Sequence, residues 1–95
     1  MIRNIVLLRL KPDTPPEHMR AFEAAMRKIP FHGLRSLTMG YDLGLRDGNM
    51  TYAVIVDLAD DDAYRAYDAD PEHNRIRREM LAPVAERIER CQYRL

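Results

Sequence analysis

The chain has 95 residues, of which 46% are hydrophobic and 32% charged, and this composition is typical of one small globular domain. Its 15 acidic and 15 basic residues cancel, so it lacks the positive field that attracts nucleic acid or an anionic membrane. The single cysteine, Cys91, excludes an internal disulfide and a cysteine metal site. Arg9 interrupts the opening apolar run, which is therefore no signal peptide, and no segment approaches the ~20 apolar residues of a membrane span. We expect a cytoplasmic protein.

The first half of the chain predicts a strand, a helix and a second strand. Residues 2–11 carry apolar side chains on both faces, as in a strand that is buried on both sides. Residues 11–29 predict a helix with Thr14 as its N-cap, Pro15 as its first residue and Glu17 completing a capping box. Acidic and basic side chains, including Glu23, would form its solvated face. Residues 34–43 predict the second strand.

The second half predicts two strands around a broken helical region. The Asp47–Gly48 pair indicates a hairpin turn, and residues 50–58 predict the third strand. Asp60 is the expected N-cap of a short helix, and Asp70 caps a second helical piece that Pro83 ends. Residues 86–95 alternate in polarity and predict the last strand.

This order of elements predicts one α+β domain over residues 1–95. The β-α-β-β-α-β series is the ferredoxin-like arrangement, with one four-stranded antiparallel sheet and the helices on one face. The first and third strands are apolar on both faces, so the sheet keeps an apolar face that no helix covers. A second copy of the chain is the simplest cover, and we therefore predict a homodimer. In the alternative, Thr, Arg and Gln side chains keep that face hydrated and the chain stays monomeric.

The ordered motifs resemble those of the stress-responsive A/B barrel (Dabb) family, a branch of the dimeric α+β-barrel superfamily. The matching pieces are "NIVLLRLKP" with "TPPE", "LTMGYDLG", "YAVIVDLADDDAYRAYDADPEH" and the closing strand, so the resemblance covers the whole chain. The family pattern has a tyrosine followed by His-Pro-x-His, which Tyr67 and His73 match. Asp70 replaces the first histidine of that pair, and Asn4 replaces the family's opening histidine.

The resemblance implies a protomer whose sheet packs on that of a partner and encloses an apolar cavity. It leaves three functions open. The protein could be a dimer that binds a small apolar or aromatic ligand without a known reaction. It could be a cofactor-independent cyclase or isomerase acting on a polyketide-like or aromatic carbonyl compound. It could be a barrel monooxygenase, although related heme-degrading barrels commonly use a tryptophan, and this chain has none.

His73 and Tyr67 are the candidate catalytic residues. A helix N-terminus disfavours an added positive charge, so the imidazole of His73 should stay neutral and able to accept a proton. The phenol of Tyr67 could orient a carbonyl or an enolate. In the structural alternative, His73 only completes the helix start that Asp70 caps.

The candidate ligand-binding residues are Asn4, Val6 and Leu8, which share the strand face that we assign to the barrel interior. Asn4 can form hydrogen bonds but cannot act as a base near neutral pH, so a catalytic pair resembling that of the family's plant cyclase is incomplete here. We predict no metal and no cofactor, because the three histidines lack the spacing of a metal site. His18 is expected to be solvated, and the acidic run at Asp60 to cap a helix.

Overall fold

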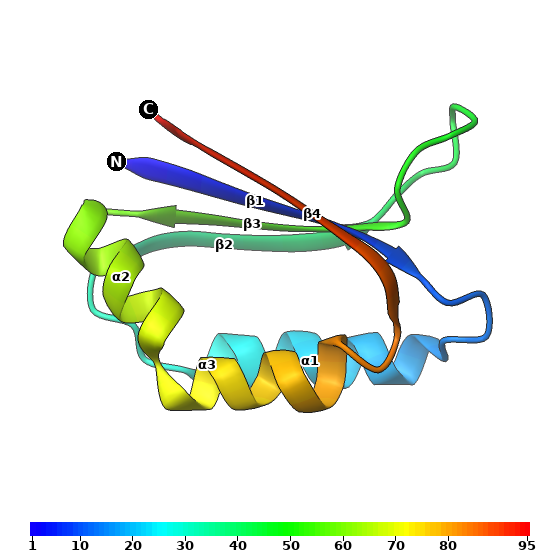
Figure 1. The fold of residues 1–95 in the computed structure, drawn as a ribbon, viewed down its shortest axis with the longest axis horizontal. Helices are drawn as coiled ribbons and strands as arrows, with labels where there is room; N and C mark the ends of the chain where they lie inside the picture. Colours follow the sequence, from blue (N-terminus) through cyan, green and yellow to red (C-terminus); the bar gives the residue numbers. More distant parts are fainter.

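The computed structural model describes residues 1–95 as one antiparallel sheet with helices on one side (Figure 1). The elements follow as β1 (Ile2–Leu10), α1 (Pro16–Lys28), β2 (Leu34–Tyr41), β3 (Tyr52–Leu58), α2 (Asp61–Ala69), α3 (Pro71–Ile76), the π-helical segment η1 (Arg77–Leu81) and β4 (Ala85–Arg94). The strand order is β2-β3-β1-β4. The ferredoxin-like prediction is therefore confirmed, with the second helical region divided into three segments. No helix has the length and hydrophobicity needed to span a lipid bilayer.

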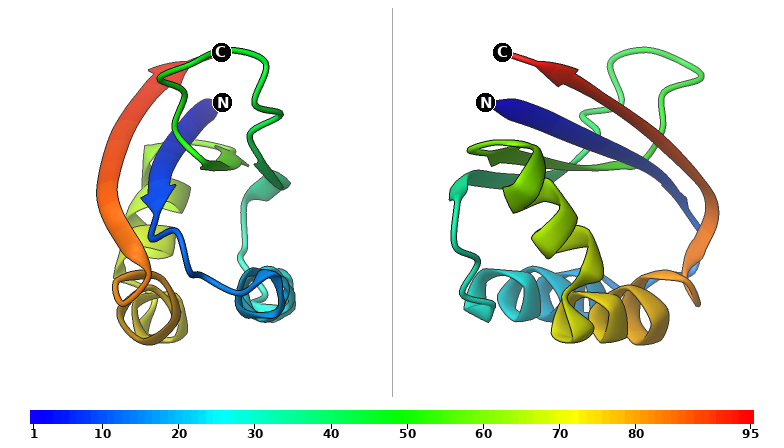
Figure 2. Two further views of the ribbon diagram at one scale, coloured as in Figure 1. Left: turned by 90° about the vertical axis from the view of Figure 1, so that its right-hand side faces the viewer. Right: turned by 60° about the vertical axis from the view of Figure 1, so that its left-hand side comes forward.

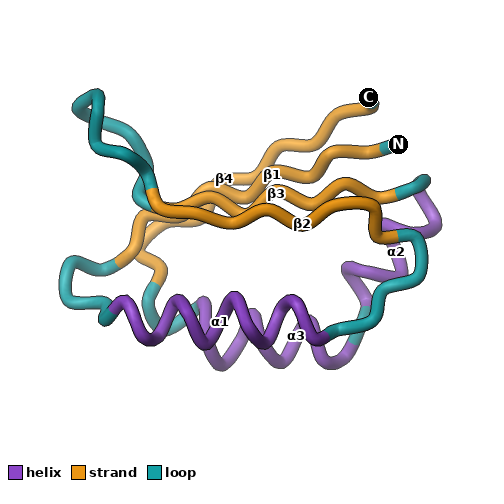
Figure 3. The backbone as a smooth tube through the Cα atoms, turned by 180° about the vertical axis from the view of Figure 1, so that it is seen from behind, coloured by secondary structure: helices purple, strands orange, loops and turns teal.

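The even-numbered residues of β1 point toward the helical layer. Directly opposed residues of antiparallel strands lie on the same face of the sheet, and the register places Val6 opposite Val54 of β3. These strands form one core with the apolar side of α1, in which Leu8 and Phe22 are almost completely inaccessible. The core therefore lies between the sheet and the layer that α1 and α3 form below it (Figure 3).

The prediction that Asn4, Val6 and Leu8 face a partner-shared barrel interior is wrong, because this face is covered by the chain's own helices. The physical reason is the distribution of charge on β1. The even-numbered positions carry no charged residue, whereas Arg3 and Arg9 flank the apolar centre of the other face. The apolar side of α1 therefore packs against the uncharged face.

The other face of the sheet has no cover within the chain (Figure 2). Its apolar centre comes from three neighbouring strands: Ile5 and Leu7 on β1, Ala53 and Ile55 on β3, and Cys91 on β4. We call these five residues the open apolar patch. At one end of the patch Arg3 donates two hydrogen bonds to the carboxylate of Asp57, both 2.8 Å long. A domain with such an exposed apolar face is suited to association.

The start of α1 differs from the prediction. Pro16 is the first helical residue and Pro15 is the N-cap, with extended backbone and no side-chain acceptor. A residue that precedes proline is pushed out of the helical region, so the helix begins after Pro15 rather than after Thr14. The hydroxyl of Thr14 instead donates to the carbonyl of Lys11 at 2.7 Å, and Glu17 pairs with Arg20.

The strands β2 and β3 are both shorter than predicted, and a loop over residues 42–51 joins them. Asp42 ends β2 because its carboxylate accepts hydrogen bonds from the backbone N–H of Gly44 at 2.8 Å and from the side chain of Asn49 at 2.9 Å. Gly48 takes a positive φ of 86°, as the predicted Asp-Gly turn requires. The loop extends away from the helical layer, beyond the open face (Figure 1).

Both predicted caps in the second helical region are confirmed. The carboxylate of Asp60 accepts the backbone N–H of Ala63, and that of Asp70 accepts the backbone N–H of His73, each at 2.8 Å. The helix then widens into η1, where the N–H of Ala82 bonds to the carbonyl of Arg77 five residues earlier. The chain thus changes direction between Tyr67 and His73, which brings their side chains together.

Candidate functional site

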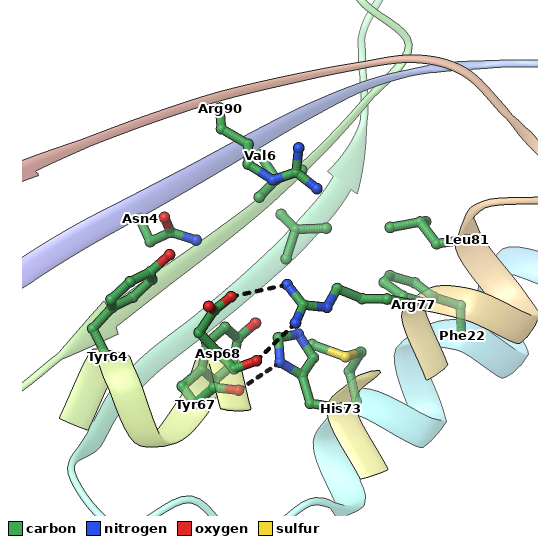
Figure 4. A pocket seen from close by; sticks show the side chains of 12 residues that line it. Asn4, Val6, Phe22, Tyr64, Tyr67, Asp68, His73, Arg77, Leu81 and Arg90 are labelled. Carbon is green, nitrogen blue, oxygen red and sulfur yellow. Dashed lines mark hydrogen bonds and ion pairs between the residues drawn. The ribbon is translucent and has the colours of Figure 1, made fainter. Parts of the chain in front are cut away.

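A small pocket lies between the sheet and the helical segments α2, α3 and η1 (Figure 4). Its cavity volume is about 50 Å³, which limits any ligand to a small molecule. Twelve residues line it: Asn4, Val6, Phe22, Met26, Val54, Tyr64, Tyr67, Asp68, His73, Arg77, Leu81 and Arg90. Apolar side chains form most of its wall, and the polar groups come from both the sheet and the helices.

His73 is a buried histidine with one ring nitrogen committed and the other free. Its Nδ1 lies 2.8 Å from the carbonyl oxygen of Tyr67. A carbonyl oxygen only accepts, so Nδ1 carries the hydrogen and the neutral ring keeps its lone pair on Nε2. No protein group bonds to Nε2, and no buried side-chain nitrogen or oxygen lacks a partner. Nε2 is therefore accessible from the pocket that His73 lines.

Burial sets the protonation state of His73. The side chain is 3% exposed, and its desolvation lowers the pKa below 6.5, against a smaller opposing effect of the hydrogen bond to Tyr67. The nearby guanidinium of Arg77 lowers the pKa further. The ring is therefore neutral at neutral pH, with an unprotonated Nε2 facing the cavity.

Tyr67 packs directly beside His73. The two ring centroids are 4.0 Å apart with an interplanar angle of 41°. The ring centroid of Phe31 lies 4.7 Å from that of Tyr67. Burial raises the pKa of the Tyr67 phenol well above its usual value of 10, so the hydroxyl stays protonated and able to donate. That hydroxyl has no partner in the chain and is accessible.

Asn4 forms the sheet side of the pocket and is also buried, at 6% exposure. Its Oδ1 accepts a hydrogen bond of 3.1 Å from Gln92 on the neighbouring strand β4, which leaves its Nδ2 hydrogens free for the pocket. In Figure 4 the Asn4 side chain lies on the wall opposite the His73 ring. The site can thus offer a base, a phenolic donor and an amide donor around one small cavity.

The predicted residues have different places in this site. The structure brings His73, Tyr67, Asn4 and Val6 together around one cavity. Leu8 does not line the cavity and lies in the core at 0% exposure. The assigned roles in catalysis and ligand binding stay predictions.

Sequence reasoning missed two arginines of the site. Arg90 extends from β4 beside Val6, its register partner. The ferredoxin-like strand order places the last strand beside the first, so this neighbour was open to inference from the sequence. Arg77 bonds back to Asp68 across the helix break, and no local pattern indicated that contact.

The other histidines and acidic residues do not join the site. His18, predicted to be solvated, instead bonds through Nε2 to the backbone carbonyl of Met80 at 2.5 Å, which links α1 to η1. His32 is exposed. No group of three or more His, Cys, Asp or Glu side chains is arranged to hold a metal ion.

The fold and the site define a ferredoxin-like α+β protein with a pocket between its sheet and its second helical region. The chain belongs to the stress-responsive A/B barrel domain (Dabb) family, whose sequence profile matches residues 2–93. The resemblance inferred from the motifs is thereby confirmed. No curated protein matches the chain.

Solved structures with the same fold include proteins of known and unknown function. A dimeric ferredoxin-like protein of unknown function from Thermobifida fusca has 32% identity and a TM-score of 0.87, over 99% of this chain and 90% of that one. A Dabb family protein from Mesorhizobium loti has 21% identity and a TM-score of 0.80, over 99% and 95%. The hydroxynitrile lyase of Passiflora edulis has 20% identity and a TM-score of 0.81, over 97% and 90%.

Proposed function

We propose that this protein is a homodimeric Dabb-domain enzyme that moves a proton on a small carbonyl compound without a cofactor, with His73 as the general base. The observation that carries the proposal is the hydrogen bond from His73 Nδ1 to the carbonyl of Tyr67. It fixes the tautomer that leaves a neutral, accessible Nε2 inside a mostly apolar pocket.

In the proposed step, Nε2 removes a proton from the carbon next to the carbonyl group. The C–H electron pair moves into the new carbon–carbon double bond, and the carbonyl π electrons move to oxygen, which gives an enolate. The hydroxyl of Tyr67 donates a hydrogen bond to that oxygen. Return of the proton from Nε2–H to carbon restores the base, so no oxidant or other co-reactant is needed.

The cavity volume of about 50 Å³ favours a small substrate over a polyketide chain. The Passiflora relative is an enzyme, which supports the idea that this fold accommodates catalysis. Homodimer formation is proposed because the open apolar patch has no cover within the chain, and the Thermobifida relative is described as dimeric.

Exchange of carbonyl-adjacent hydrogen for deuterium, followed by proton NMR in D2O, tests the proposed step. The probes are butanone and 2-oxobutanoate. We expect exchange above the buffer rate for at least one probe, an ~100-fold or larger loss in His73→Gln, and an ~100-fold loss in Tyr67→Phe. The control is His32→Gln, on an exposed residue with no hydrogen bond.

Gln can still donate to the Tyr67 carbonyl, and circular dichroism and thermal melting establish that each variant is folded. If the wild-type protein does not raise the rate of hydrogen exchange above that in buffer, the proposal is overturned. An unchanged exchange rate in a folded His73→Gln variant would also overturn it. In the first case the protein is a binding dimer without turnover of these probes.

A further inference from the structure

An unpaired guanidinium lies at the pocket. Arg90 lines the cavity from β4, and it makes no hydrogen bond or ion pair within the chain. The other two arginines of β4 are both paired with carboxylates, Arg87 with Glu89 and Arg94 with Asp61. In Figure 4 the Arg90 side chain extends from the sheet toward the cavity rather than away from it.

A second guanidinium faces Arg90 from the helical side. Arg77 holds one carboxylate, with Nη1 at 3.3 Å from Asp68 Oδ1 and Nη2 at 2.9 Å from the Asp68 carbonyl oxygen. Asp68 is the one acidic residue among those that line the pocket. Two fixed positive charges therefore share one negative charge, and the pocket keeps an excess of one positive charge.

The amide of Asn4 adds a neutral donor beside Arg90. Gln92 occupies the Asn4 carbonyl oxygen at 3.1 Å, so only the Nδ2 hydrogens remain to meet a ligand. Asn4 and Gln92 are register partners, and so are Val6 and Arg90 two residues further along the same strands. Asn4 and Arg90 are thus diagonal neighbours on the face of the sheet that lines the pocket. A guanidinium next to an N–H donor matches the two oxygens of a carboxylate.

We propose that the pocket selects small carboxylates, with the ligand's carboxylate on Arg90 and Asn4 and its carbonyl group toward Tyr67 and His73. The second half of this assignment rests on the proposed function. The substrate class is then a short-chain oxoacid, because the cavity volume of about 50 Å³ leaves no room for a long chain.

The test is a binding titration of the folded wild-type protein, followed by amide chemical-shift changes, with 2-oxobutanoate and with its uncharged methyl ester. We expect the acid to bind at least tenfold more tightly than the ester. Arg90→Gln should abolish this preference. Arg78→Gln should preserve it, because Arg78 is an exposed arginine of η1 that does not line the pocket.

Equal affinities for acid and ester in the wild type would overturn the carboxylate assignment, and so would an unchanged preference in Arg90→Gln. Comparison of this titration with the hydrogen-exchange measurement on the wild type separates the two proposals. A retained preference for the acid without hydrogen exchange in the wild type would leave the carboxylate site standing and remove the catalytic function. Catalysed hydrogen exchange on butanone without any binding preference for the acid would remove the carboxylate site and leave the catalytic function standing.

Discussion

At the scale of single residues, His73 combines a structural and a chemical role. Its backbone N–H bonds to the Asp70 cap and its Nδ1 bonds to the carbonyl of Tyr67, so the residue joins α2 to α3 across the break. The residue is only 3% exposed, so its ring is packed among other side chains. Removing the ring should therefore lower stability as well as activity, which is why glutamine rather than alanine is the informative replacement.

The Asp70 cap at the start of α3 allows a test of how His73 is positioned. Asp70→Ala removes the acceptor for the His73 N–H and should cost ~1 kcal/mol of unfolding free energy, measured by urea denaturation. Asp60→Ala removes an equivalent cap from α2 and should cost a similar amount. Only Asp70→Ala should also slow hydrogen exchange on the carbonyl probe. An equal effect of both variants on exchange would show that the cap does not position His73.

The lowered pKa of His73 predicts a pH dependence of stability. In the unfolded chain the ring has its ordinary pKa of 6.5, and burial lowers this value in the folded chain. Between these two values the unfolded state binds more protons, so stability is complete above pH 6.5 and falls as the pH drops toward the folded pKa.

Urea denaturation between about pH 7.5 and about pH 5 measures this dependence. The unfolding free energy of the wild type should fall more steeply below pH 6.5 than that of His73→Gln. The lowered pKa of Asp57 changes the unfolding free energy only as the pH falls below the ordinary value of 3.8, which is outside the pH range of this measurement. Parallel curves for the two proteins would contradict the buried, neutral state of the ring.

At the scale of elements, close packing between the α1–β2 connection and α2 sets the position of the helices over the sheet. Gly33 has a φ of 88°, and a Cβ at this position would lie 2.8 Å from the Cβ of Ala63. Its carbonyl also accepts the N–H of Ala59 at 2.9 Å, just before α2 begins. Glycine is therefore required for both the backbone conformation and the space.

Gly33→Ala and Gly44→Ala separate these two requirements. Gly44 has a similar φ of 73°, but a methyl group added there would meet no other atom within 4 Å. Gly44→Ala should cost ~1 kcal/mol from the left-handed backbone alone. Gly33→Ala should cost clearly more, since α2 must shift to relieve the contact. Thermal melting of both variants checks this, and equal losses would mean that the packing of α2 tolerates the methyl group.

The sequence predicted the elements well where a local rule acts alone. The caps at Asp60 and Asp70 and the turn at Gly48 follow from single side chains and backbone preferences, and all three are present. The prediction was wrong where two rules competed. Thr14 suits an N-cap, but Pro16 keeps Pro15 out of the helical conformation, so the helix begins after Pro15. Contacts between distant segments, such as Arg77 with Asp68, depend on the tertiary path and leave no local pattern.

At the scale of the whole molecule, the two faces of the sheet have different roles. The face with Val6 packs on the helices and forms the pocket, while the open apolar patch is available to a partner. Alternation along β1 predicted that both faces are apolar, but it could not decide which one the helices cover. That choice follows from Arg3 and Arg9, whose charges leave the face with Val6 as the one that the helices cover.

Leu7→Asp tests the dimer at the open apolar patch. Leu7 is 37% exposed in the single chain, and a carboxylate in an apolar interface would be desolvated without a partner. Sedimentation at micromolar concentration should show a dimer for the wild type and a shift to monomer for Leu7→Asp. Ala24→Asp adds the same charge to the exposed side of α1 and should remain dimeric. A monomeric wild type would sink the proposed assembly.

The central claim is that His73 presents a neutral, accessible Nε2 to the pocket, and ¹⁵N NMR of its imidazole ring tests this most directly. At neutral pH we expect the tautomer with hydrogen on Nδ1, a titration midpoint below 6.5, and a shift of the Nε2 resonance when 2-oxobutanoate is added. His73→Gln identifies the resonance by its loss. Hydrogen on Nε2, or a ring that is charged at neutral pH, would contradict the claim.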